Sequence, residues 1–414
     1  MKNASFITFF VFLFFAVGIL PAQKGINKQA TYKTVQKHLY QNETKLYAIG
    51  TGHEKTNAMF LEVNDKNIII RSGSVEKQIA LPEYFIGLYP SRGGAYFAVA
   101  ELIPQEKYRP SDKHLRIDVY SSEGDGLYTV QRLHHYDDPV PQIIVSDNGG
   151  TLILGRSAEG RLLFYSAEGQ LAGEAVLFGD GEYDLERWLK MAISLDGNRL
   201  AVCAGKRGAS PMDSDAPHPS AEPYLFLFDG QGVKQWQKRL AKDTPQNVAF
   251  SPDGRSIFTA GFSAYQDGRI EKMTRLFRDN GAVVQSWPVL FRTADFSPAT
   301  GNALLADRSN VYVIDTGSGQ MTAKKPFPPE QGLINAVRFN TTGDRILVLT
   351  AVNRFDEGRF IFKQPALHIL TPEGTTVQTL PFPDETFLEP ALQIDNDRVF
   401  IGFTHHLYKI EKTR

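Results

Sequence analysis

Short apolar segments alternate with tight polar turns along most of the chain, and one such pattern recurs. In its clearest copy an apolar segment ends at Phe250, the turn SPDG follows at residues 251–254, and a second apolar segment spans residues 255–260. Ser and Asp side chains bond to nearby backbone N–H groups in turns, and Gly accepts the positive φ that many turns need. The pattern therefore predicts an antiparallel β-hairpin.

The same order of apolar segment, turn and apolar segment recurs from one end of the chain to the other. Anchored on the residue after the first segment, the copies fall at Pro90, Ser146, Ser194, Ser251, Ser297, Asn340 and Asp395. Subtraction gives spacings of 56, 48, 57, 46, 43 and 55 residues, near the roughly 40 to 50 residues of a propeller blade. A third strand and a more polar fourth strand follow each hairpin, which is typical of a four-stranded blade.

The two ends of the chain decide the number of blades. After the last anchor the pattern leaves only three strands, at residues 391–394, 399–403 and 407–410. Residues 31–38 then supply the missing fourth strand, and a full blade follows them at residues 46–81. The sequence predicts an all-β fold, a single β-propeller over residues 23–414 with four antiparallel strands per blade. Eight blades are favoured, and seven remain the alternative because seven-bladed rings are more abundant.

The amino-terminal segment has the pattern of a secretory signal peptide rather than of a blade. Lys2 precedes an apolar run at residues 6–20, and Pro21 and Ala22 lead into polar sequence. This order of charge, apolar core and small residue predicts cleavage after Ala22, so that residues 1–22 are removed. A retained anchor fits less well because the run is shorter than a spanning helix requires. We expect an exported protein, periplasmic or extracellular, without a stable membrane span after cleavage.

Composition narrows the classes of partner. The formal net charge of -1 does not provide the basic surface that nucleic-acid binding needs, so no nucleic-acid partner is predicted. Hydrophobic residues make up 42% of the chain, enough for a large folded core. Cys203 is the single cysteine, so no disulfide forms within the chain.

The repeated turn resembles that of bacterial WD-repeat-like and YVTN-type β-propellers. Two further turns resemble quinoprotein-type blades: DGQG at residues 229–232 before Trp236, and DNG at residues 279–281 before Trp287. The resemblance covers almost all of the expected mature chain and implies a propeller scaffold. The chain departs from true WD repeats because no Trp-Asp dipeptide closes a third strand, and the tryptophan is not present in every blade. The resemblance therefore implies a fold and not a function.

Long connections between second and third strands are the main candidates for a binding surface. They are predicted at residues 101–113, 205–222, 262–272 and 351–365, on the same face of the ring as the fourth-to-first connections. Long loops on a rigid scaffold often carry function, and Arg and aromatic side chains suit a protein or peptide partner. The candidate partner-binding residues are Lys107, Tyr108, Arg109, Arg207, Tyr265, Arg269, Arg354, Phe355, Arg359 and Phe360.

Two histidine pairs are the best candidates for a metal site. His134 and His135 lie near Asp137, and His405 and His406 lie at a predicted second-to-third turn. Adjacent strand residues point to opposite sides, so no metal is favoured, and no cofactor is predicted.

No nucleophile elbow, zinc-protease motif or phosphate loop is present in the sequence. The leading hypothesis is therefore a non-enzymatic binding or assembly module. The alternative is a propeller hydrolase or lactonase-like enzyme with a polar site at the channel mouth.

Overall fold

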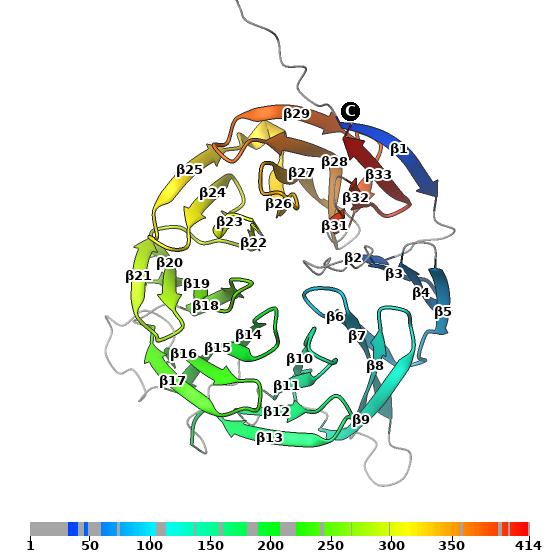
Figure 1. Ribbon diagram of the computed structural model, residues 1–414, viewed down its shortest axis with the longest axis vertical. Helices are drawn as coiled ribbons and strands as arrows, with labels where there is room; N and C mark the ends of the chain where they lie inside the picture. The colour runs from blue at the N-terminus through cyan, green and yellow to red at the C-terminus, as the bar shows by residue number, and fades with distance from the viewer. Residues whose placement is uncertain are drawn as a thin grey trace, which may run out of the picture.

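A computed structural model describes residues 32–39, 45–48, 59–72, 75–104, 113–135, 138–156, 160–179, 189–207, 221–240, 244–265, 267–297, 299–356, 359–387, 391–395 and 398–412. In these ranges the strands form eight sheets around a common axis (Figure 1). Their only helical element is the short 3-10 turn η2 (Pro329–Gln331), and they contain no helix suited to crossing a membrane. The predicted eight-bladed, all-β propeller is confirmed. The predicted signal peptide lies outside the described residues.

Each blade is an antiparallel sheet whose strands follow one another outward from the central axis (Figure 1). Blades 1 to 4 are β2–β5 (Lys45–Ala48, Met59–Val63, Asn67–Ser72, Val75–Ala80), β6–β9 (Phe85–Pro90, Tyr96–Pro104, Lys113–Ser121, Gly126–His134), β10–β13 (Gln142–Val145, Leu152–Arg156, Arg161–Tyr165, Leu171–Val176) and β14–β17 (Lys190–Ile193, Arg199–Arg207, Ala221–Asp229, Lys234–Arg239). Blades 5 to 7 are β18–β21 (Thr244–Phe250, Ser256–Ala264, Ile270–Arg278, Val283–Trp287), β22–β25 (Thr293–Phe296, Asn302–Ala306, Asn310–Asp315, Met321–Pro326) and β26–β29 (Leu333–Phe339, Ile346–Asp356, Arg359–Leu370, Thr376–Pro381), with β30 (Thr386–Phe387) added to β28.

Blade 8 joins the two ends of the chain. Its strands are β31, β32 and β33 from the carboxy-terminal end and β1 from the amino-terminal end (Ala391–Asp395, Arg398–Gly402, His406–Lys412, Tyr32–Leu39). The strand expected at residues 31–38 is therefore β1, which pairs with β33 from Tyr32 opposite Lys412 to Leu39 opposite His406. Gln378 of blade 7 accepts a hydrogen bond from the Tyr32 N–H at 2.8 Å and donates to its carbonyl at 3.0 Å.

The repeated turn is closed by the same backbone hydrogen bond in six blades. In blade 5 the Ser251 N–H donates to the Ser256 carbonyl at 2.9 Å, and Ser251 Oγ accepts from the Ser256 N–H at 2.9 Å. Gly254 has φ 65°, the left-handed conformation that Gly adopts without strain. The residues equivalent to Ser251, each closing the turn with its own N–H, are Ser91, Ser146, Ser194, Ser297 and Asn340.

Two of the predicted anchors are therefore wrong. Pro90 is the last residue of β6, and the equivalent position in blade 2 is the next residue, Ser91. Proline has no N–H to close the turn, which explains the shift by one position. In blade 8 the ladder between β31 and β32 begins with Asp395 opposite Arg398, so this hairpin has a shorter turn than the others.

Apolar side chains fill the spaces between neighbouring blades. Between blades 3 and 4, Ile153 and Phe164 pack with Phe226 and Phe228, all 2% exposed or less. Burial of such a side chain contributes roughly 1.5 to 3 kcal/mol. Cys203 is fully buried in the neighbouring cluster and acts there as a small apolar residue.

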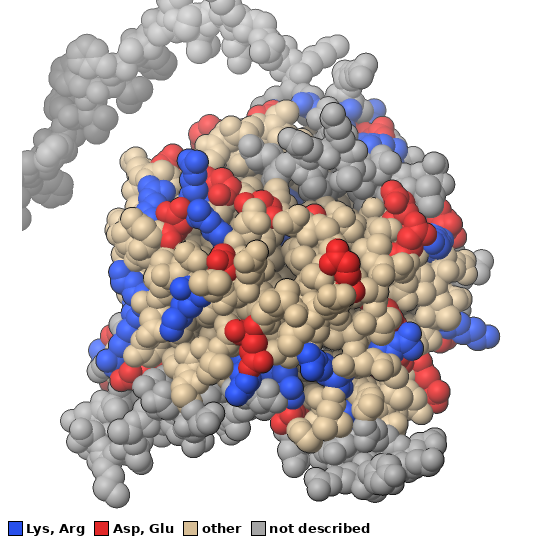
Figure 2. Space-filling model, turned by 60° about the horizontal axis from the view of Figure 1, so that its bottom comes forward, with Lys and Arg blue, Asp and Glu red and all other residues tan. Residues whose placement is uncertain are grey.

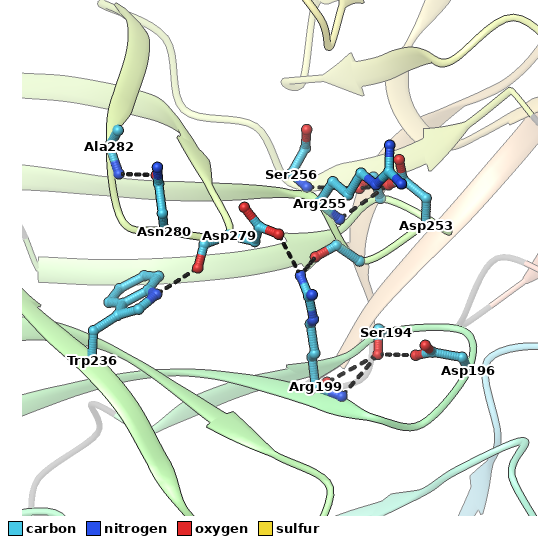
Figure 3. A network of polar contacts seen from close by, with 12 residues as sticks. Ser194, Asp196, Arg199, Trp236, Asp253, Arg255, Ser256, Asp279, Asn280 and Ala282 are labelled. Carbon is cyan, nitrogen blue, oxygen red and sulfur yellow. Dashed lines mark hydrogen bonds and ion pairs between the residues drawn. The ribbon is translucent and has the colours of Figure 1, made fainter.

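Polar contacts also connect neighbouring blades on the face of the ring that carries the first-to-second and third-to-fourth turns, here called the turn face. Arg199 of blade 4 donates to the Gly254 carbonyl at 2.9 Å and to Asp279 Oδ2 at 2.8 Å, both in blade 5 (Figure 3). The Trp236 indole N–H donates to the Asp279 carbonyl at 2.6 Å. In this chain, Trp236 and the DNG turn therefore join two blades.

Candidate functional site

The opposite face carries the second-to-third and fourth-to-first connections, and it is here called the hairpin face. Two of its four predicted loops are regular β-structure. β27 continues to Asp356 and β28 begins at Arg359, and the two are paired there. Likewise β19 continues to Ala264, which is paired with Ile270 at the start of β20. The expectation that these segments lie outside the strand ladder is therefore wrong. Residues 105–112 and 208–220, in the other two predicted loops, lie outside the described residues.

The end of the β27–β28 hairpin presents an arginine and an aromatic ring. Arg354 lies opposite Ile361, and Phe355 lies opposite Phe360, near the end of the ladder. Arg354 is exposed, and Phe355 is 66% exposed, the highest value among the large apolar side chains of the described residues. Arginine and large aromatic side chains carry much of the binding energy in protein interfaces.

A third strand holds this hairpin in place. β30 comes from the fourth-to-first connection and pairs with β28, with Phe387 opposite Phe362. The two phenyl rings are stacked, and their centroids are 5.0 Å apart. Gln364 has φ 54°, next to an irregularity in the β27–β28 register, and its N–H donates to the Glu385 carbonyl at 3.3 Å. The hairpin is thus fixed to the body of the ring near its base.

The end of the β19–β20 hairpin is a compact group of polar and aromatic side chains. The guanidinium of Arg269 lies over the Tyr265 ring, 4.3 Å from its centroid. The Tyr265 hydroxyl donates to Glu271 at 2.7 Å, and Arg269 pairs with Asp267 and Glu271 at 3.4 Å. Tyr265 and Arg269 therefore form a pre-arranged cation–aromatic pair on blade 5.

The predicted partner-binding residues do not form one continuous patch among the described residues. Arg354 and Phe355 belong to blade 7, whereas Tyr265 and Arg269 belong to blade 5. Arg207, Arg359 and Phe360 lie in described strands, but their side chains are outside the description, as are Lys107, Tyr108 and Arg109 entirely.

In each histidine pair one residue ends or begins a strand and the other lies just outside it. His134 ends β9 and is 6% exposed, and burial lowers the pKa of its imidazole; His135 is exposed. His405 is exposed in a turn, and His406 begins β33. Nowhere in the described part of the chain do three His, Cys, Asp or Glu side chains gather in a metal-binding arrangement. Asp137 lies outside that part.

A buried carboxylate near the base of the β27–β28 hairpin was not anticipated as a site. Glu385 is 5% exposed; it accepts from the Tyr408 hydroxyl at 2.6 Å and from Lys37 Nζ at 3.3 Å, and His406 Nδ1 lies 2.9 Å away. Burial pushes the pKa of Glu385 up, but these hydrogen bonds outweigh it and leave the pKa below its ordinary value. The cluster joins β1, β33 and the fourth-to-first connection.

Charged side chains are mixed over the surface. Figure 2 shows Lys and Arg interspersed with Asp and Glu, separated by wide uncharged areas, without a large patch of one sign on the face in view. This distribution agrees with the net charge of -1.

Comparison with known proteins shows similarity in fold only. No protein-family model matches the chain, and no curated protein matches it. Among solved structures it is similar to the C-terminal WD40 domain of Sif2, with a TM-score of 0.55 and 9% identity over 92% of this chain and 99% of that one. A eukaryotic initiation factor matches with a TM-score of 0.47 and 12% identity over 89% of each chain. The WD40-like propeller fold is confirmed, and the YVTN-type and quinoprotein-type resemblance stays a prediction.

Proposed function

We propose that the protein is an exported binding or assembly module that engages a protein or peptide partner through its hairpin face. The observation that carries this proposal is the end of the β27–β28 hairpin, where the exposed Arg354 and Phe355 lie on strands braced by β30. A hairpin already held in place loses little conformational freedom on binding, which favours affinity.

The fold supports a binding role without identifying the partner. Domains with the WD40 propeller fold commonly mediate protein interactions, and this chain has that architecture. The same scaffold serves many unrelated functions, so the choice of the hairpin face rests on its own residues.

Export is proposed from residues 1–22 alone. The apolar run at residues 6–20 between Lys2 and Ala22 is the basis for a periplasmic or extracellular location. Amino-terminal sequencing of the protein purified from its native cells is expected to begin at Gln23. A sequence that begins at Met1 contradicts the proposal.

The partner surface is tested by a double substitution at the hairpin end. Arg354→Ala with Phe355→Ala is expected to weaken partner binding by about 2 kcal/mol or more if both are hot-spot residues. The partner is first captured from envelope extract with the mature protein, identified, and then titrated by calorimetry. Circular dichroism verifies the fold, because these residues belong to a paired ladder.

The matched control is a double substitution on the turn face. Glu168 and Glu373 are in third-to-fourth turns of blades 3 and 7, and Glu168→Ala with Glu373→Ala is expected to leave binding unchanged. Full binding by the hairpin variant together with lost binding by the control assigns the partner to the turn face and contradicts the proposal.

The enzymatic alternative, a hydrolase or lactonase-like activity at the channel mouth, is a separate hypothesis. Ester and lactone hydrolysis by the mature protein, measured by pH-stat, tests it directly.

A further inference from the structure

One arginine reaches across the central channel on the turn face. Arg92 lies in the first-to-second turn of blade 2, and its guanidinium carbon is 5.2 Å from the centroid of the Phe296 ring. Phe296 ends β22, the inner strand of blade 6, which is directly across an eight-bladed ring from blade 2. The guanidinium is therefore placed at this channel mouth, stacked on a ring from the far side.

Two carboxylates nearby are already committed to other donors. Asp147, in the equivalent turn of blade 3, accepts hydrogen bonds from Ser91 Oγ at 2.6 Å and from the Gly93 N–H at 2.6 Å. Asp295 of β22 accepts from the Phe339 N–H at 2.7 Å. Both carboxylates interact electrostatically with Arg92 without forming an ion pair with it.

The donors of Arg92 thus have no acceptor among the described residues: its contacts there are the Phe296 ring and longer-range charges. Burial lowers the pKa of Arg92, Asp295 and Asp147 oppose this effect, and the charge of Arg338 in β26 adds to it. A guanidinium carries five N–H donors in a fixed fork. Arg92 is partly buried, and its nitrogens are not among the fully buried side-chain atoms that lack a partner. The fork is therefore open to an acceptor from outside the described protein.

We propose that this mouth of the channel binds a small molecule through a single carboxylate group, held in the fork of Arg92 with Arg338 beside it. A carboxylate matches the planar guanidinium in two parallel hydrogen bonds. The charges of Arg92, Arg338, Asp147 and Asp295 sum to zero, so a monoanion adds one uncompensated charge and a phosphate dianion adds two. The carboxylate is thus the favoured class. The site is on the face opposite the proposed partner surface and does not depend on it.

The test uses sodium acetate and sodium benzoate as carboxylate probes and sodium phosphate as the competing class, at constant ionic strength. Binding to the whole mature protein is measured by calorimetry and by the ligand-dependent rise in melting temperature. Arg92→Ala is expected to weaken carboxylate binding by about tenfold or more, the usual effect of losing a charged hydrogen bond. Arg92→Lys keeps the charge but lacks the fork, and it is expected to bind more weakly than the wild type.

Arg255→Ala is the matched control, because Arg255 is an exposed arginine in the equivalent turn of blade 5. It is expected to bind the carboxylates as the wild type does, and circular dichroism verifies that each variant is folded. Equal carboxylate binding by the wild type and Arg92→Ala, or no binding by the wild type, overturns the site. Tighter binding of phosphate than of either carboxylate overturns the assigned class.

Discussion

The protein is expected to lose stability when the pH falls, and replacing His368 with Gln is expected to make that loss much smaller. His368 is 5% exposed in β28, where Nε2 lies 2.9 Å from Thr350 Oγ1 and Nδ1 lies 3.1 Å from Thr379 Oγ1. The ring of Phe327, which follows β25 of the preceding blade, meets the imidazole in an edge-to-face arrangement with the ring centroids 5.0 Å apart. Burial, with a smaller effect from the charge of Lys325, lowers the pKa of His368 from 6.5 to about 4.

The direction in which stability changes with pH follows from this pKa. Between pH 6.5 and about 4 the unfolded chain binds a proton at this histidine that the folded protein does not. The stability contribution is therefore complete above about pH 6.5 and is lost as the pH falls through that window. At about 1.4 kcal/mol per pKa unit, the full effect is about 3 kcal/mol, of which about 2 kcal/mol is lost by about pH 5.

The assay is urea unfolding followed by far-UV circular dichroism at about pH 7 and about pH 5. Over this interval the free energy of unfolding of the wild type is expected to fall by about 2 kcal/mol more than that of His368→Gln. Any constant cost of the substitution cancels, because only the pH dependence is compared. His405→Gln removes an exposed histidine and is expected to follow the wild type. An equally steep fall for His368→Gln and the wild type would refute the reasoning.

Two further experiments, one substitution and one chemical labelling, test the buried groups Glu385 and Cys203. Glu385→Gln is expected to cost about 1.5 to 3 kcal/mol at neutral pH, as charged hydrogen bonds to Tyr408 and Lys37 are lost. The pKa of Glu385 is lowered, so this contribution to stability is present above the ordinary carboxyl pKa and disappears as the pH falls through the folded-state pKa. Urea unfolding measures the cost at neutral pH and its pH dependence, with the exposed Glu168→Gln as the control. Burial raises the pKa of the Cys203 thiol to about 12, so Ellman's reagent is expected to label it only after unfolding, and fast labelling of the native protein would contradict its burial.

The blades were predictable from the sequence because their signal is local. In six blades a serine or an asparagine opens the turn, a glycine follows three or four residues later, and apolar residues lie on either side, all within about a dozen positions. The prediction was wrong where a local signal is ambiguous. Residues 359–363 place Phe-Ile-Phe, which are common in strands, between two charged residues. Their polar neighbours suggested a loop, yet the structure extends β28 through them.

The charged clusters were hidden because their members are distant in the sequence. Glu385 is visible as an acid in a connection, but its partner Lys37 is 348 residues away. Arg92 left a weak signal: the residue after the turn-opening serine is Leu195 in blade 4 and Pro252 in blade 5, but Arg92 and Asp147 in blades 2 and 3. Only the ring geometry shows that this position borders the channel.

The pairing of β1 with β33 also sets the order in which the molecule can be completed during synthesis. Tyr32 and Lys412 are 380 positions apart. At about 5 to 20 residues per second, the first strand waits about 20 to 75 s for its partner to be made. Until then the face of blade 7 around Ile369, which packs against blade 8, stays uncovered, and exposed surface of this kind promotes aggregation. A chain that stops shortly before β31 therefore leaves the ring open, with the apolar face of blade 7 exposed.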